Sequence, residues 1–87
     1  MSYYVIRVNN TKNDSIFYLN SWIFESNMRS VDFTYNLNEA MILPNDDNKV
    51  FDFLKGLIQS IRGDHYECSL VRVQRVTVIV EPNTNLE

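Results

Sequence analysis

Apolar residues recur along the chain at two spacings, and each spacing predicts a different element. Between Pro44 and Gly63 the spacing is helical, and six apolar positions form one stripe: Val50, Phe51, Leu54, Leu57, Ile58 and Ile61. Asn45 or Asp46 can cap the start of this helix, and Gly63 can take the left-handed conformation that ends it. Because a stripe this wide needs a partner surface, the pattern predicts an amphipathic helix packed on a second layer.

Four other segments have the alternating or continuously apolar character of strands. They are residues 3–8, 15–22, 31–35 and 67–81. Turn-forming residues at 9–14 predict a hairpin between the first two segments, and 25–30 is a second polar segment. The alternation in the last segment changes phase, which predicts a bulge near Gln74 and Arg75 within one long bent strand.

The connection between the third strand and the helix also has a readable pattern. Residues 36–40 predict a single helical turn capped by an asparagine side chain, and 41–43 predict a short extended piece before the proline. In chain order the elements predict an α+β fold of the type β-β-β-α-β. We expect a mainly antiparallel sheet of four or five strands, with the first strand near its centre and the one long helix packed on one face.

Length and composition indicate a single small domain. With 87 residues, of which 45% are hydrophobic, nearly every strong hydrophobe is needed for the core and little remains for a deep pocket. We expect the domain to span residues 1–85, and the final pair, Leu86 and Glu87, reads as the remnant of a cloning site. A net charge of −3 weighs against a general polyanion binder, because such proteins carry a basic surplus.

The same features predict where the protein resides. The single cysteine, Cys68, excludes an internal disulfide, and no apolar run approaches the length of a membrane span. The first residues lack the basic and apolar regions of a secretory signal. We therefore expect a cytoplasmic protein without a membrane partner.

Residues with catalytic or metal-binding side chains form no convincing site. His65, Glu67 and Cys68 are too close together to converge on a metal, and the chain has no second histidine or cysteine. A nucleophilic cysteine would need a nearby base, so Cys68 is expected to be a small buried hydrophobe. Two glycines cannot build a phosphate-binding loop. The sequence predicts no enzyme, no catalytic residue, no metal and no cofactor.

Aromatic residues and arginines on the predicted strands are the candidates for binding. The residues we select are Tyr18, Trp22, Tyr35, Arg72 and Arg75. Exposed aromatic residues and arginine are enriched in protein interfaces, whereas the same aromatic rings on an open sheet face can stack on unpaired bases. A third interpretation is that most of the rings are buried against the helix. The acidic balance disfavours nucleic acid among these alternatives.

Two parts of the sequence together resemble a known group of proteins. The opening strand, Tyr-Tyr-Val-Ile-Arg, is followed by Tyr-Leu-Asn-Ser-Trp at 18–22, and Phe-Thr-Tyr-Asn-Leu-Asn-Glu-Ala lies at 33–40. This combination resembles small uncharacterised proteins encoded by phages and prophages of low-GC Gram-positive bacteria. The resemblance implies an accessory or host-interaction protein and carries no activity onto particular residues.

Three functional hypotheses follow. The first is a non-enzymatic protein-binding module that contacts a protein partner or a second copy through an open sheet face or an edge strand. The second is a single-stranded nucleic-acid-binding protein, in which Arg7, Arg72 and Arg75 would pair with phosphates. The third is an acidic inhibitor of a host nucleic-acid-binding protein, in which carboxylates imitate phosphates; the candidates are Asp46, Asp47 and Asp52.

Overall fold

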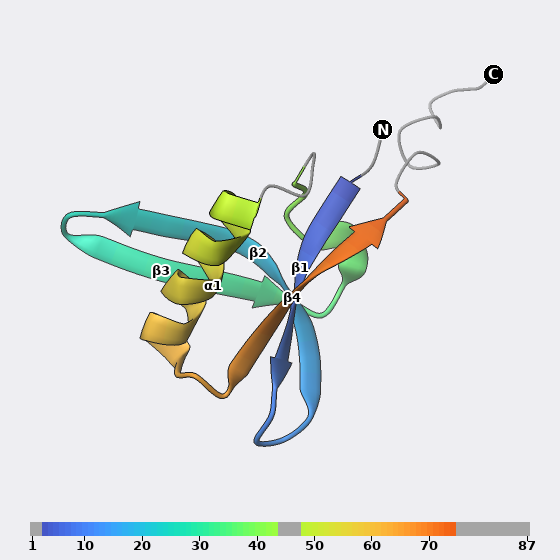
Figure 1. The fold of residues 1–87 in the computed structure, drawn as a ribbon, viewed down its shortest axis with the longest axis horizontal. Coiled ribbons are helices and arrows are strands. Elements are labelled where there is room, and N and C mark those ends of the chain that lie inside the picture. The colour runs from blue at the N-terminus through green and yellow to red at the C-terminus, as the bar shows by residue number, and fades with distance from the viewer. Residues whose placement is uncertain (1–2, 44–47, 75–87) are drawn as a thin grey trace.

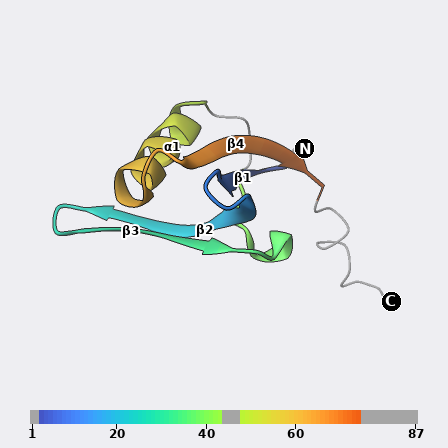
Figure 2. The ribbon, with the colours of Figure 1, turned by 90° about the horizontal axis from the view of Figure 1, so that it is seen from below.

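A computed structural model describes residues 3–43 and 48–74 of the chain. Its elements are β1 (Tyr3–Asn10), β2 (Ser15–Glu25), β3 (Met28–Thr34), the 3-10 helix η1 (Leu37–Glu39), α1 (Asn48–Arg62) and β4 (Tyr66–Val73). The four strands form one antiparallel sheet in the order β3-β2-β1-β4, and α1 lies across one face (Figure 1, Figure 2). The predicted fold class, element order and central position of β1 are confirmed, and a fifth strand is not seen among the described residues.

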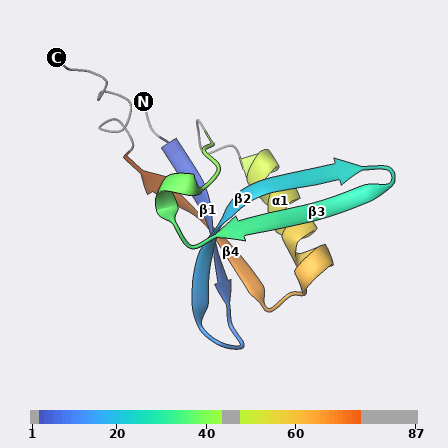
Figure 3. The same ribbon diagram turned by 180° about the vertical axis from the view of Figure 1, so that it is seen from behind.

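The long strand β2 belongs to two ladders. Residues 15–18 pair with β1, from Ser15 opposite Asn10 to Tyr18 opposite Arg7. Residues 18–25 pair with β3, and the register shifts between Leu19 and Ser21, so that one residue of β2 is extra at this point. Such a bulge bends a strand and increases its twist. As a result, the far part of the β2–β3 hairpin extends away from β1 and β4 (Figure 1, Figure 3).

This hairpin is longer than the sequence pattern predicted. The prediction ended the second strand at residue 22, began the third at 31 and made the polar segment 25–30 a connection. In the structure the ladder continues to Glu25 opposite Met28, with only two residues in the turn. The prediction was wrong here because Arg29 and Ser30 are paired across the ladder although their side chains are polar. We call residues 21–30 the arm.

Residues 36–43, which follow β3, form the predicted capped turn and extended piece. The Asn36 side chain accepts a hydrogen bond from the Asn38 amide at 2.9 Å and caps η1. Leu43 exchanges backbone hydrogen bonds of 2.8 and 2.9 Å with Tyr4, and the Met41 amide donates to the Leu19 carbonyl at 2.8 Å. The extended residues 41–43 therefore satisfy backbone groups of β1 and β2 where those two strands separate.

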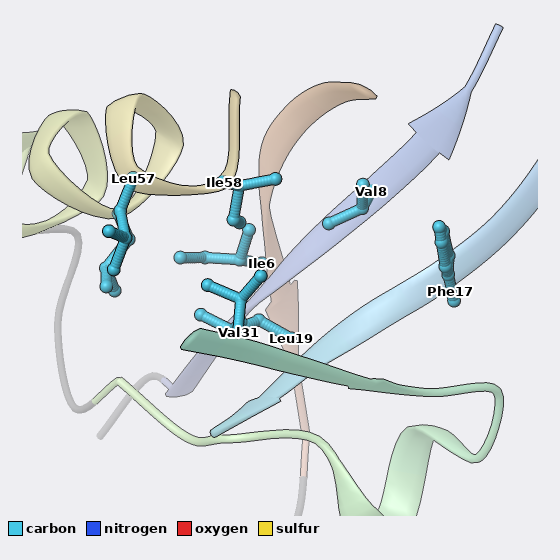
Figure 4. Packing of buried hydrophobic residues seen from close by; sticks show 8 residues of the cluster. Ile6, Val8, Phe17, Leu19, Val31, Leu57 and Ile58 are labelled. Atoms are coloured by element: carbon cyan, nitrogen blue, oxygen red, sulfur yellow. The ribbon is translucent and has the colours of Figure 1, made fainter. Parts of the chain in front are cut away.

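The core lies between the sheet and α1. It contains Ile6 and Val8 from β1, Phe17 and Leu19 from β2, Val31 from β3, and Leu54, Leu57 and Ile58 from α1 (Figure 4). Of the predicted apolar stripe, Phe51 packs at the margin of this core, while Val50 and Ile61 are exposed. Burying one leucine or isoleucine contributes about 1.5–3 kcal/mol, which is more than the roughly 1 kcal/mol that a helix glycine costs. The helix can therefore accommodate Gly56.

The structure tests the predicted end of α1 but not its predicted caps. Gly63 has a φ of 108° and its amide donates to the Gln59 carbonyl at 2.9 Å, so the predicted helix end is confirmed. The predicted caps Asn45 and Asp46 lie outside the described residues. The same holds for the predicted continuation of the last strand to residue 81 and for Arg75 at the predicted bulge.

Candidate protein-binding surface

The predicted site residues do not share one face of the sheet. Tyr18 pairs with Arg7, and both point away from α1, because the alternate positions Ile6 and Val8 belong to the core. Arg72 is exposed on β4 and lies on the other face, the one shared with Leu70 and covered in part by α1. Arg7 and Arg72 therefore lie on opposite sides of the sheet.

The other predicted site residues also have separate positions. Tyr35 is 76% exposed just after β3, and its ring stacks on Phe17 with centroids 5.8 Å apart. Trp22 lies in the arm, directly opposite the core residue Val31, and thus faces α1. Arg75 lies outside the described residues. The structure does not gather the four described side chains, Tyr18, Trp22, Tyr35 and Arg72, into one binding site.

The arm concentrates exposed apolar surface. Four large apolar side chains within seven residues are exposed, at 37% for Trp22, 38% for Ile23, 47% for Phe24 and 54% for Met28. Side chains alternate along a strand, so Trp22 and Phe24 face α1, whereas Ile23 faces away, as does Met28 opposite Glu25. The arm thus carries apolar side chains on both of its faces.

Phe53 joins the arm to α1. Its ring meets Trp22 edge to face at a centroid distance of 5.5 Å and Phe24 at 5.2 Å. On the arm, the guanidinium of Arg29 lies 5.0 Å from the centre of the Phe24 ring. Edge-to-face ring pairs of this kind contribute about 0.5–1.5 kcal/mol each beyond their buried area. Phe53 itself remains 41% exposed, so these rings form an open cluster at the surface.

An open groove of about 340 Å³ lies beside this cluster. Its lining comes from the arm and from one side of α1, and consists of Phe24, Asp52, Phe53, Gly56, Leu57 and Ser60. A Cβ atom built on Gly56 would meet nothing within 4 Å. Close packing inside the described part of the chain therefore does not explain why a glycine stands in the middle of this helix.

A more polar cavity of about 280 Å³ lies on the sheet face away from the arm groove. It is lined by Arg7, Asn9, Ile16, Glu67, Cys68 and Ser69. Burial raises the pKa of the Cys68 thiol to about 11, against the opposing effect of the Lys55 ammonium. A thiol that keeps its proton is a poor nucleophile and metal ligand.

Within residues 3–43 and 48–74, no three histidine, cysteine or carboxylate side chains come together in a way that could hold a metal ion.

Side chains of α1 reach both edges of the sheet. Arg62 donates from Nη2 to the Val31 carbonyl of β3 at 3.3 Å, and Gln59 donates from Nε2 to the Tyr66 carbonyl of β4 at 3.1 Å. Both edge strands thus have a backbone acceptor already satisfied by the helix. This occupation makes simple strand addition at these two points less favourable than contact through side chains.

Of this surface, the sequence pattern predicts Trp22 as a binding residue but does not predict Ile23, Phe24, Met28 or Phe53. A signal existed for Phe53, since it is an aromatic residue that lies outside the apolar stripe of its helix. The pattern ends the strand at Trp22 because the polar segment 25–30 has the composition of a connection. The structure shows that the strand continues through it.

No family model, curated protein or solved structure matches the chain. None of the helices in the described ranges has the length and apolar character needed to cross a membrane.

Proposed function

We propose that this chain is a non-enzymatic protein-binding module that makes its contact through the arm. The observation that carries the proposal is the exposure of Trp22, Ile23, Phe24 and Met28 on a hairpin that is not enclosed by the core. Aromatic residues and methionine are the residue types enriched at the centre of protein interfaces. Their presence together on one projecting element supports a docking role over a purely structural one.

Charge and position also support a protein partner. The arm carries one arginine, Arg29, and one acidic residue, Glu25, so it lacks the basic surplus that binds phosphate backbones. Arg7 and Arg72, which the nucleic-acid hypothesis needs on one surface, lie on opposite sides of the sheet. A role as a phage or prophage accessory protein fits this picture and rests on the resemblance of the sequence.

Site-specific photo-cross-linking tests the proposal. A photoreactive phenylalanine analogue replaces Ile23 in the arm, and in a matched control it replaces Ile16, which lies on the same strand, faces the same side and is 49% exposed. Irradiation in an extract of a low-GC Gram-positive bacterium is expected to give a discrete protein adduct at position 23 and none at 16. Unlabelled wild-type protein should compete the adduct away, whereas the Ile23→Ser, Met28→Ser variant should not. Equal labelling at both positions, or no adduct at position 23, would overturn the proposal.

A further inference from the structure

We propose that the partner which fills the groove between the arm and α1 is a second copy of this chain. The inference rests on the proposed function and names the partner for the side of the arm that faces α1. It leaves the opposite side, with Ile23 and Met28, for another protein.

The shape of the groove is one reason. Gly56 lies in its lining, between Phe53 and Ser60 on the same side of α1, and the space above the glycine is empty within the described chain. A glycine on an exposed helix side lets another molecule approach the helix backbone closely. Next to this space stands Phe24, a ring that is 47% exposed and projects from the arm. One surface thus offers both a projecting ring and a hollow that a ring can enter.

A symmetric dimer would use both features twice. In a two-fold dimer the same patch is present on both sides, so a contact from residue i to residue j is repeated from j to i. With the axis parallel to the groove, the arm of each copy lies on α1 of the other copy. Phe24 of one copy then covers Gly56 of the other, and both exposed rings leave the solvent.

The charges around the groove favour the dimer in which the arm of each copy lies on α1 of the other. Arg29 lies on the arm side, with its guanidinium over the Phe24 ring, and Asp52 lies on the helix side. Both are exposed. Placing the arm of one copy on the helix of the other brings Arg29 of each copy toward Asp52 of the other, whereas placing arm on arm would bring the two arginines together. For this pair of charges the patch is therefore self-complementary in the arm-on-helix dimer and repulsive in the arm-on-arm dimer.

Charge exchange at these two positions provides the test. Sedimentation equilibrium measures the mass of the wild type, Asp52→Arg, Arg29→Asp and an equal mixture of the two variants, after circular dichroism has shown that each is folded. The wild type is expected to rise from the 10.3 kDa of one chain toward twice that mass as concentration increases. Each variant alone places like charges opposite each other and is expected to stay at the mass of one chain. The mixture restores both attractive pairs and is expected to associate again.

Gly56→Gln provides an independent test of the hollow. The longer side chain meets no atom of the described chain near its Cβ, so the variant is expected to fold and to remain at the mass of one chain. A wild type that keeps the mass of one chain at every concentration would overturn the dimer, and so would variants that still dimerise alone or a mixture that fails to associate.

The two proposals fail in different ways. If the wild type does not dimerise but the adduct at position 23 forms, the dimer proposal is wrong and the proposed binding module is still supported. A dimer with the expected charge dependence but no adduct at position 23 confirms the self-contact and removes the outside partner.

Discussion

The two glycines of the chain are expected to respond in opposite ways to substitution by alanine. Gly63 has a φ of 108°, and a Cβ atom there would lie 2.8 Å from Cε1 of His65. Gly56 is in regular helix with free space where its Cβ would be. Gly63→Ala is therefore expected to lower the free energy of unfolding by more than about 1 kcal/mol, whereas Gly56→Ala is expected to raise it by about 0.5–1 kcal/mol.

Urea unfolding at a protein concentration that keeps the chain monomeric measures both changes. The double variant Gly63→Ala, His65→Ala separates the collision from the backbone strain, since it removes the imidazole and leaves φ unchanged. Partial recovery is expected, because the left-handed conformation still disfavours alanine. A neutral Gly63→Ala would mean that the helix does not end in this conformation.

Among residues 3–43 and 48–74, Cys68 is a residue whose ionisation the fold changes clearly. Burial raises the pKa of its thiol from 9.0 to about 11, so between these two values the folded chain keeps a proton that the unfolded chain releases. The contribution of this thiol to stability is complete below pH 9 and falls as the pH rises toward 11. Alkylation by iodoacetamide is expected to be slower in the folded protein than in the urea-unfolded chain at pH 9, and to accelerate as the pH approaches 11. Equal rates in the two states at pH 9 would show that the folded thiol is not held neutral.

At the level of the elements, the sequence predicted best where packing and local pattern agree. The centres of the four strands, the helix end at Gly63 and the turn capped by Asn36 each follow from periodicity or from one residue with a known local preference. The length of the arm did not follow, because its ladder is held by backbone pairing between residues whose side chains are exposed. Hydrophobic periodicity reflects the burial of side chains, so it does not predict the part of a strand that extends beyond the core.

The candidate surface was less predictable for a related reason. The β2 bulge reverses the side-chain alternation after Leu19, so the residues that face α1 change from the odd-numbered Phe17 and Leu19 to the even-numbered Trp22 and Phe24. No pattern within a single strand reveals this reversal, because it depends on how β2 is shared between β1 and β3. Trp22 was selected for its residue type, and its neighbours across the groove come from a helix about thirty residues later in the chain.

For the whole molecule, the orientation of the arm depends on a small number of ring contacts. The core residues lie over the centre of the sheet, and among the described side chains Phe53 is the one that forms ring pairs with both Trp22 and Phe24. Phe53→Ala removes both pairs from a side chain that is already 41% exposed. The arm is therefore expected to lose its alignment on α1 while the core keeps most of its stability.

Trp22 is the only tryptophan and reports this change directly. In Phe53→Ala its emission is expected to shift to longer wavelength, and amides in the arm are expected to exchange hydrogen faster than those of β1, because local opening of the hairpin no longer breaks a contact with the helix. Ile61→Ala is the matched control, since it truncates a side chain on the same helix that is 36% exposed. An emission spectrum that Phe53→Ala leaves unchanged would mean that the arm is held by its own ladder and the bulge alone. The arm would then keep its position beside α1 without Phe53, the groove would only be widened where the Phe53 ring is lost, and dimerisation through Phe24 and Gly56 would survive the same substitution.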